Sequence, residues 1–76
     1  MNLRTYFRSL DAAAQEEFAR RAGTTANYIR SHLACEPPRK IPRQRLLEGL
    51  VQASDGALSL TDLVDYFYRS LQQGAA

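Results

Sequence analysis

The sequence predicts an all-α fold, a compact bundle of about five helices that contains a helix-turn-helix. Apolar residues recur three and four positions apart in five segments, and the alternation typical of strands is nearly absent. Valine, isoleucine and threonine, which favour strands, are few. The 76 residues are 45% hydrophobic and 24% charged, which is typical of one small folded domain over residues 1–76.

The first helix is expected over residues 3–10. Leu3, Phe7 and Leu10 are spaced i, i+4 and i+7, which places them on one helical face. Asn2 precedes them and belongs to the residue types that accept a hydrogen bond at a helix N-cap. We therefore expect a short helix with one buried side.

The second helix is expected over residues 12–22, after Asp11 as its N-cap. Acidic residues come early in this segment and basic residues late, which matches the helix macrodipole. Gly23 follows at the position where a helix often ends in a left-handed conformation. One face of the helix is lined by Ala14, Phe18, Ala19 and Ala22.

The third helix is expected over residues 25–33, with either Thr24 or Thr25 as its N-cap, so the connection from the second helix is very short. The next segment, ACEPPRKIP, is expected to be a loop because two consecutive prolines cannot continue a helix. Pro42 then suits the first turn of the following helix.

The last two helices are expected over residues 43–53 and about 61–72, separated by a turn at residues 54–56. Either Ser59 or Thr61 caps the final helix. The inner side of the first of these helices consists of Leu46, Leu47, Leu50 and Val51. The final helix carries an apolar stripe of Leu60, Leu63, Val64, Phe67 and Leu71.

The net charge of +2 conceals an uneven distribution of charge along the chain. Residues 1–19 carry a net charge of −1, residues 20–45 carry +6 and residues 46–76 carry −3. A charged segment is often only a solvated face. A basic middle flanked by acidic ends is also typical of an anion-binding surface, with nucleic acid as the leading candidate.

The segment QEEFARRAGTTANYIRSHLA has the spacing of a helix-turn-helix. This motif needs a small residue on its first helix, a glycine at the turn four residues later, and an apolar anchor six residues after the glycine. Ala19, Gly23 and Ile29 meet these requirements. Gln15 occupies the first position of the motif, where the helix meets the DNA backbone.

A helical projection centred on Ile29 at about 100° per residue predicts which side chains of the third helix face outward. The packed side consists of Thr25, Ala26, His32 and Leu33. The outward side consists of Asn27 and Ser31, with Ala34 nearby and Arg30 and Tyr28 on the two shoulders. The outward asparagine, serine and arginine are residue types that form hydrogen bonds with base edges.

The opening MNLRTYFRSL, the motif ARRAGTTANYIRSHL and the segment IPRQRLLEGLVQASDG together resemble small regulators of the Cro/λ-repressor type. They most resemble the YdaS-like, Cro-like proteins of phages and prophages, over a core of about residues 2–56. The resemblance implies a λ repressor-like DNA-binding fold, with the third helix in the major groove and homodimers on inverted-repeat operators. It also implies base contacts from Ala26, Asn27, Tyr28, Arg30 and Ser31, and a contact of Gln15 with the DNA backbone.

Further contacts are expected from the basic loop and from the last helix. Contacts with DNA phosphates are expected from Thr25, Arg39, Lys40, Arg43 and Arg45. Arg20 and Arg21 either complement their own helix end or contact phosphate. The amphipathic helix at about 60–72 is a candidate dimerisation element, with an interface formed by Tyr66, Phe67 and Tyr68, although such aromatic residues are more often core.

Several classes of site are not expected. One cysteine excludes an internal disulfide, and one cysteine with one histidine cannot form a structural zinc site. No apolar run approaches the roughly 20 residues of a membrane span, and the N-terminus lacks the apolar stretch of a secretory signal. His32 is expected to pack inward, Cys35 to be inert, and the adjacent Glu16 and Glu17 to face different directions, so we expect no enzyme activity.

The sequence therefore predicts a sequence-specific transcription regulator, a repressor that binds double-stranded DNA as a homodimer. We expect no cofactor, metal, membrane or small-molecule ligand, and a bacterial or phage-encoded protein at the nucleoid in the cytoplasm. The alternative is a small helical protein–protein interaction module, antitoxin-like or adaptor-like, that uses the acidic C-terminal helix. The two functions differ in their use of the outward face of the third helix.

Overall fold

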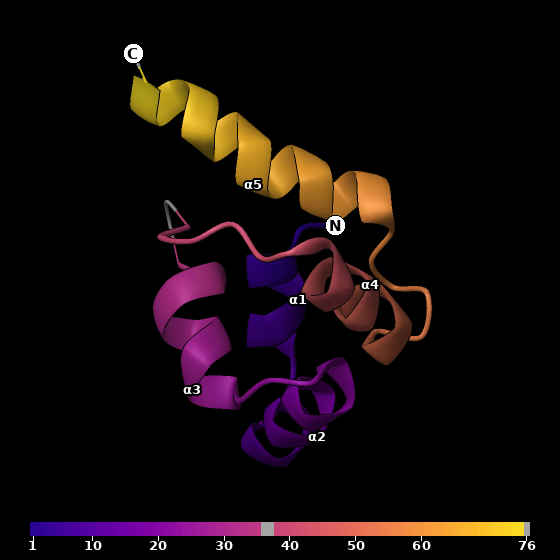
Figure 1. Ribbon diagram of the computed structural model, residues 1–76. Coiled ribbons are helices and arrows are strands. Elements are labelled where there is room, and N and C mark those ends of the chain that lie inside the picture. The colour runs from indigo at the N-terminus through magenta and orange to yellow at the C-terminus, as the bar shows by residue number, and fades with distance from the viewer. Residues whose placement is uncertain (36–37, 76) are drawn as a thin grey trace.

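The computed structural model describes residues 1–35 and 38–75, with side chains of the C-terminal helix as far as Arg69. Within this part of the chain the structure contains helices and no strand, which confirms the predicted all-α bundle (Figure 1). The helices are α1 (Leu3–Ser9), α2 (Ala12–Ala22), α3 (Ala26–Tyr28), the π-helical turn η1 (Ile29–Leu33), α4 (Gln44–Ala53) and α5 (Leu60–Ala75).

Side-chain caps mark the beginnings of α1, α2, α3 and α5. The caps of α1, α2 and α3 are hydrogen bonds from Thr5 N to Asn2 Oδ1 at 2.8 Å, from Ala14 N to Asp11 Oδ1 at 2.8 Å, and from Tyr28 N to Thr25 Oγ1 at 3.1 Å. At α5, Asp62 N donates to Ser59 Oγ at 3.0 Å and Ser59 N donates to Asp62 Oδ2 at 3.1 Å. Of the alternatives that the sequence allows, Thr25 and not Thr24 caps α3, and Ser59 and not Thr61 caps α5.

Two glycines determine how α2 meets its neighbours. Gly23 ends α2 with a φ of 92°, in the left-handed region that the sequence predicts for this residue. Gly49 lies inside α4, where a Cβ atom would be 2.6 Å from the carbonyl oxygen of Ala22. Because no side chain fits in that space, Gly49 allows the backbones of α2 and α4 to approach closely.

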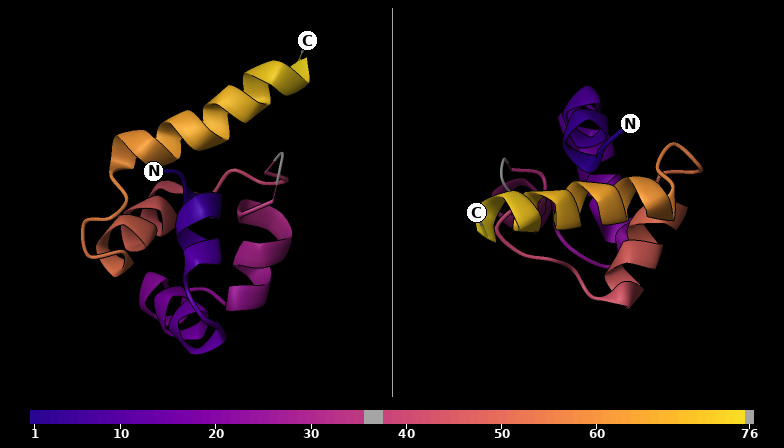
Figure 2. Two further views of the ribbon diagram at one scale, coloured as in Figure 1. Left: turned by 180° about the vertical axis from the view of Figure 1, so that it is seen from behind. Right: turned by 90° about the horizontal axis from the view of Figure 1, so that it is seen from above.

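All of the α-helices contribute to one hydrophobic core, and α5 lies across one end of the bundle, against α1 and α4 (Figure 2). The least exposed side chains include Leu3, Ile29, Leu33, Leu50, Leu63 and Phe67. The predicted apolar stripe of α5 is only partly buried. Leu60 and Val64 are 48% and 39% exposed, because the stripe is wider than the side of α5 that packs on the bundle. Leu71 lies outside the described side chains.

The π-helical turn changes which residues of the third helical segment face the core. Ala34 N donates to Ile29 O at 2.7 Å, an i to i+5 hydrogen bond that encloses more residues than an α-helical turn. The projection at 100° per residue is therefore wrong for Ala34, which is 8% exposed and belongs to the core. It is also wrong for Thr25, which is exposed because it caps the helix.

Candidate nucleic-acid interface

The segment formed by α3 and η1 is held against the core and presents polar side chains to solvent. Ile29 and Leu33 are completely buried. Asn27, Arg30 and Ser31 are exposed, as the projection predicts. We call these three residues the outer face. An amide, a guanidinium and a hydroxyl on one helical surface are suited to hydrogen bonds with base edges.

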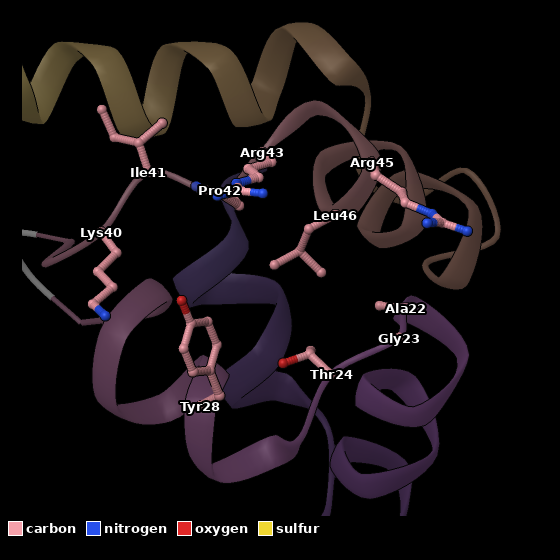
Figure 3. A pocket seen from close by; sticks show the side chains of 10 residues that line it. All are labelled: Ala22, Gly23, Thr24, Tyr28, Lys40, Ile41, Pro42, Arg43, Arg45 and Leu46. Carbon is pink, nitrogen blue, oxygen red and sulfur yellow. The ribbon is translucent and has the colours of Figure 1, made fainter.

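Two of the candidate base-contact residues do not belong to the outer face. Ala26 is 5% exposed and lies in the core, so it is removed from the candidate contacts. Tyr28 is half-buried, with its ring centroid 5.0 Å from that of His32. The hydroxyl of Tyr28 points toward the loop that precedes α4 (Figure 3).

A groove of about 800 Å³ lies between α3, the loop before α4 and the first turn of α4 (Figure 3). We call it the basic groove, because it is lined by the exposed side chains of Lys40, Arg43 and Arg45. The hydroxyl-bearing residues Thr24 and Tyr28 also line it. Positive charge and hydrogen-bond donors therefore meet in one concave surface, a combination that binds phosphate oxygens.

Backbone hydrogen bonds position the loop that carries these cations. Arg39 N and Lys40 N both donate to the carbonyl oxygen of His32, at 2.9 and 3.2 Å, which folds the loop against the end of η1. Pro42 is buried, and Arg43 has an extended backbone that leads into α4. The N-terminus of α4 forms one wall of the groove and adds its partial positive charge. The side chain of Arg39 is exposed outside the groove.

Gln15 does not have the free amide that a phosphate contact needs. Its Nε2 donates to the carbonyl oxygens of Phe7 and Leu10, at 3.0 and 3.2 Å. Its Oε1 accepts a hydrogen bond from Arg30 Nη2 at 3.2 Å. Both N–H groups of the amide therefore have partners within the protein. The expected contact of Gln15 with the DNA backbone is replaced by hydrogen bonds to the end of α1 and to Arg30.

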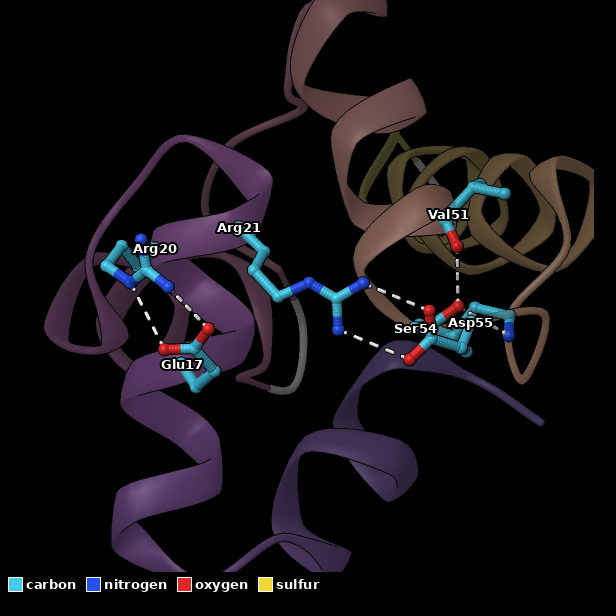
Figure 4. Close-up of polar contacts among 7 residues, drawn as sticks. Glu17, Arg20, Arg21, Val51, Ser54 and Asp55 are labelled. Atoms are coloured by element: carbon cyan, nitrogen blue, oxygen red, sulfur yellow. Dashed lines mark hydrogen bonds and ion pairs between the residues drawn. The ribbon is translucent and has the colours of Figure 1, made fainter.

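Arg20 and Arg21 are paired with acidic residues of the protein itself (Figure 4). Arg20 binds Glu17 through two guanidinium nitrogens, and Arg21 binds both carboxylate oxygens of Asp55 at 3.0 and 3.2 Å. The hydrogen bond and charge of Arg21 lower the pKa of Asp55, and the hydrogen bond of Arg20 lowers the pKa of Glu17. The two arginines therefore neutralise nearby carboxylates and do not line the basic groove.

A smaller groove of about 380 Å³ separates α2 from the start of α3. Glu16 and Glu17 line its α2 side, and Thr25 and Asn27 line its α3 side. Thr25, expected to contact phosphate, is exposed here with its hydroxyl engaged in the cap of α3. The position of these carboxylates beside the outer face follows from the packing of α2 against α3, which no local sequence pattern indicates. Arg20 also lines this groove, where it pairs with Glu17, and Glu16 adds negative charge on this side of α3.

The aromatic residues expected at a dimer interface are mostly internal. Phe67 is 1% exposed and belongs to the core, so it is removed from the candidate interface. Tyr66 is half-buried, and its hydroxyl donates to the carbonyl oxygen of Cys35 at 2.8 Å. Tyr68 alone among the three is substantially exposed, at 44%. Leu60 and Val64, two residues of the predicted apolar stripe, are also exposed and share its side of α5.

Comparisons with protein-family models, with curated proteins and with solved structures found no match. The fold and surface define a small all-α domain that presents a polar helical face close to a basic groove. Among residues 1–35 and 38–75, no group of three or more metal-ligating side chains could hold a metal ion. None of the helices in this part of the chain has the length and hydrophobicity of a membrane span.

Proposed function

We propose that the protein is a sequence-specific DNA-binding transcription regulator, a repressor that binds double-stranded DNA as a homodimer on an inverted-repeat operator. The observation that carries the proposal is the position of the outer face close to the basic groove. One surface offers base contacts and the other offers phosphate contacts, which is the usual division in DNA recognition. In this proposal α2 and α3 act as a helix-turn-helix, with α3 and η1 in the major groove.

The two surfaces recognise different parts of DNA: the outer face contacts base edges and the basic groove contacts phosphates. The Asn27 amide is suited to the adenine edge, the Arg30 guanidinium to guanine, and the Ser31 hydroxyl to either. The residues of the basic groove, together with Arg39, bind phosphates and supply affinity that is independent of sequence. Because phosphate contacts release counterions, this part of the affinity decreases as salt concentration rises.

Two copies are needed to occupy both halves of an inverted repeat. We assign their contact to Leu60, Val64 and Tyr68, which are four residues apart and which we call the α5 face. These residues are 48%, 39% and 44% exposed, so the α5 face presents apolar surface to solvent. Pairing of two such faces around a two-fold axis buries the same apolar surface on both copies.

The same exposed α5 face favours a second candidate function, a small helical module that binds a different protein. In that case α5 supplies the contact and the outer face of α3 and η1 has no ligand. The two functions are distinguished by DNA binding and by the partner found on the α5 face.

Selection of bound sequences from a random DNA pool tests the proposed function. We expect an enriched inverted repeat. Asn27→Ala and Arg30→Ala should each weaken binding to that sequence by about 1–3 kcal/mol, with little change for random DNA. Gln52→Ala, on an exposed position of α4, is the control. If no sequence is enriched, or if both variants bind selected and random DNA with wild-type affinity, the assignment of base contacts is wrong.

Analytical ultracentrifugation tests the α5 face without DNA. Val64→Lys places a charge in the apolar surface and should convert a wild-type dimer into a monomer. Thr5→Lys introduces the same charge on an exposed position of α1 and should leave the dimer unchanged. A wild-type protein that sediments as a monomer at high concentration contradicts pairing through α5 and favours the alternative module.

A further inference from the structure

Gln15 connects the end of α1 to a residue of the outer face. Its Nε2 is 3.0 Å from Phe7 O and 3.2 Å from Leu10 O, and its Oε1 is 3.2 Å from Arg30 Nη2. Gln15 is half-buried, whereas Arg30 is exposed. A side chain fixed within the bundle therefore holds a side chain on its surface.

The orientation of the Gln15 amide follows from the backbone around it. A carbonyl oxygen accepts hydrogen bonds and cannot donate them, so the nitrogen of the amide has to face Phe7 O and Leu10 O. Phe7 O also accepts from Leu10 N at 3.2 Å, which closes the end of α1. The amide oxygen is then left facing Arg30, where it accepts from the guanidinium.

We propose that Gln15 is a positioning residue for Arg30 and that this determines the base contact of Arg30, an inference that rests on the proposed DNA-binding function. A free arginine side chain samples many rotamers, and a side chain that is ordered before binding loses less entropy when the complex forms. The contact with Gln15 uses Nη2, and the guanidinium has further N–H groups to donate to a guanine edge.

This role differs from direct contact of Gln15 with phosphate. A phosphate contact would strengthen binding to every DNA sequence equally. A positioning residue acts through Arg30 alone, so it should affect only the base that Arg30 contacts. The two roles therefore predict different effects of the same substitution on selected and random DNA.

The first test uses the free protein. ¹⁵N relaxation of arginine side chains should show slower motion of Nε–H in Arg30 than in the exposed Arg45. In Gln15→Met, a substitution of similar size, the mobility of Arg30 should rise to that of Arg45, and the same change in Gln52→Met should have no effect. Equal mobility of Arg30 and Arg45 in the wild-type protein overturns the proposal. That comparison needs no variant and no DNA, so it holds even if Gln15→Met does not fold.

The second test uses the selected DNA sequence. Gln15→Met should weaken binding to it by about three- to tenfold and leave binding to random DNA unchanged. In the Arg30→Ala background the same substitution should have no further effect, because the positioned side chain is absent. A loss that persists in that background, or an equal loss for random DNA, overturns the positioning role in favour of phosphate contact. Failure of the wild-type protein to select any sequence refutes the proposed function, while the relaxation measurement still decides whether Gln15 orders Arg30.

Discussion

Substitution of Gly49 by alanine tests the close approach of α4 to α2. Helix propensity alone predicts that Gly49→Ala stabilises the protein by about 1 kcal/mol, because glycine is a poor residue inside a helix. The structure predicts the opposite. The new Cβ would lie 2.6 Å from Ala22 O and 3.3 Å from Ala22 C, whereas ordinary contacts of a Cβ begin at 3.4 Å. Both atoms belong to the backbone, so the two helices have to separate.

The magnitude follows from these opposing effects. Excess volume in a packed core costs about 1–3 kcal/mol, and contact with backbone atoms favours the upper end of that range. After subtraction of the gain in helix propensity, the net destabilisation is about 2 kcal/mol. In a domain of this size, about 1 kcal/mol lowers Tm by roughly 4–8 °C, so we expect a decrease of about 10 °C.

Thermal unfolding followed by far-UV circular dichroism measures the effect. Gln52→Ala, at an exposed position of the same helix, is the matched control and should leave Tm nearly unchanged. An unchanged or higher Tm for Gly49→Ala would refute the reasoning, because it would mean that α2 and α4 accommodate the methyl group without strain.

Three further predictions follow from the caps, the ion pairs and the groove. Ser59→Ala removes the N-cap of α5 and should lower the free energy of unfolding by about 1 kcal/mol in chemical denaturation. Because Arg21 lowers the folded-state pKa of Asp55, the stabilisation is present above the unfolded-state pKa of about 4 and is lost as pH falls through the folded-state value. Asp55→Asn should therefore show a flatter dependence of Tm on pH than the wild type in acid, and equal slopes would contradict this. Arg43→Gln should reduce the slope of log affinity against log salt by about 1 for all DNA sequences, and a sequence-dependent change would exclude a phosphate contact.

The positions of the helices could be predicted because their signals are local. Asn2 and Asp11 each lie three residues before the amide that they cap, and Gly23 directly follows the helix that it ends. Such features depend on neighbouring residues alone. Ile29 and Leu33 were also assigned correctly to the core, because helical periodicity over a few residues determines their side.

The remaining features depend on segments far apart in the sequence. Gly49 has no special role in a helical pattern, and its importance follows only from the position of Ala22. The π-helical turn that buries Ala34 breaks the regular angle on which a projection depends. The stripe of α5 has more apolar residues than the bundle covers, so periodicity could not distinguish buried Leu63 from exposed Val64. The hydrogen bond between Gln15 and Arg30 likewise joins two helices.

The hydrogen bond from the Tyr66 hydroxyl to Cys35 O, at 2.8 Å, joins α5 to the chain that leaves η1. If two copies pair through the α5 face as proposed, this bond links the pairing surface to the proposed DNA-binding segment. Tyr66 lies two residues from both Val64 and Tyr68 of the α5 face, and Cys35 is the second residue after η1 ends at Leu33. A free energy that couples two sites acts equally in both directions. Under the proposed function, a shift of Tyr66 on pairing would change DNA affinity, and DNA would change pairing by the same factor. Operator occupancy would rise more steeply with protein concentration than the binding curve of a single independent domain.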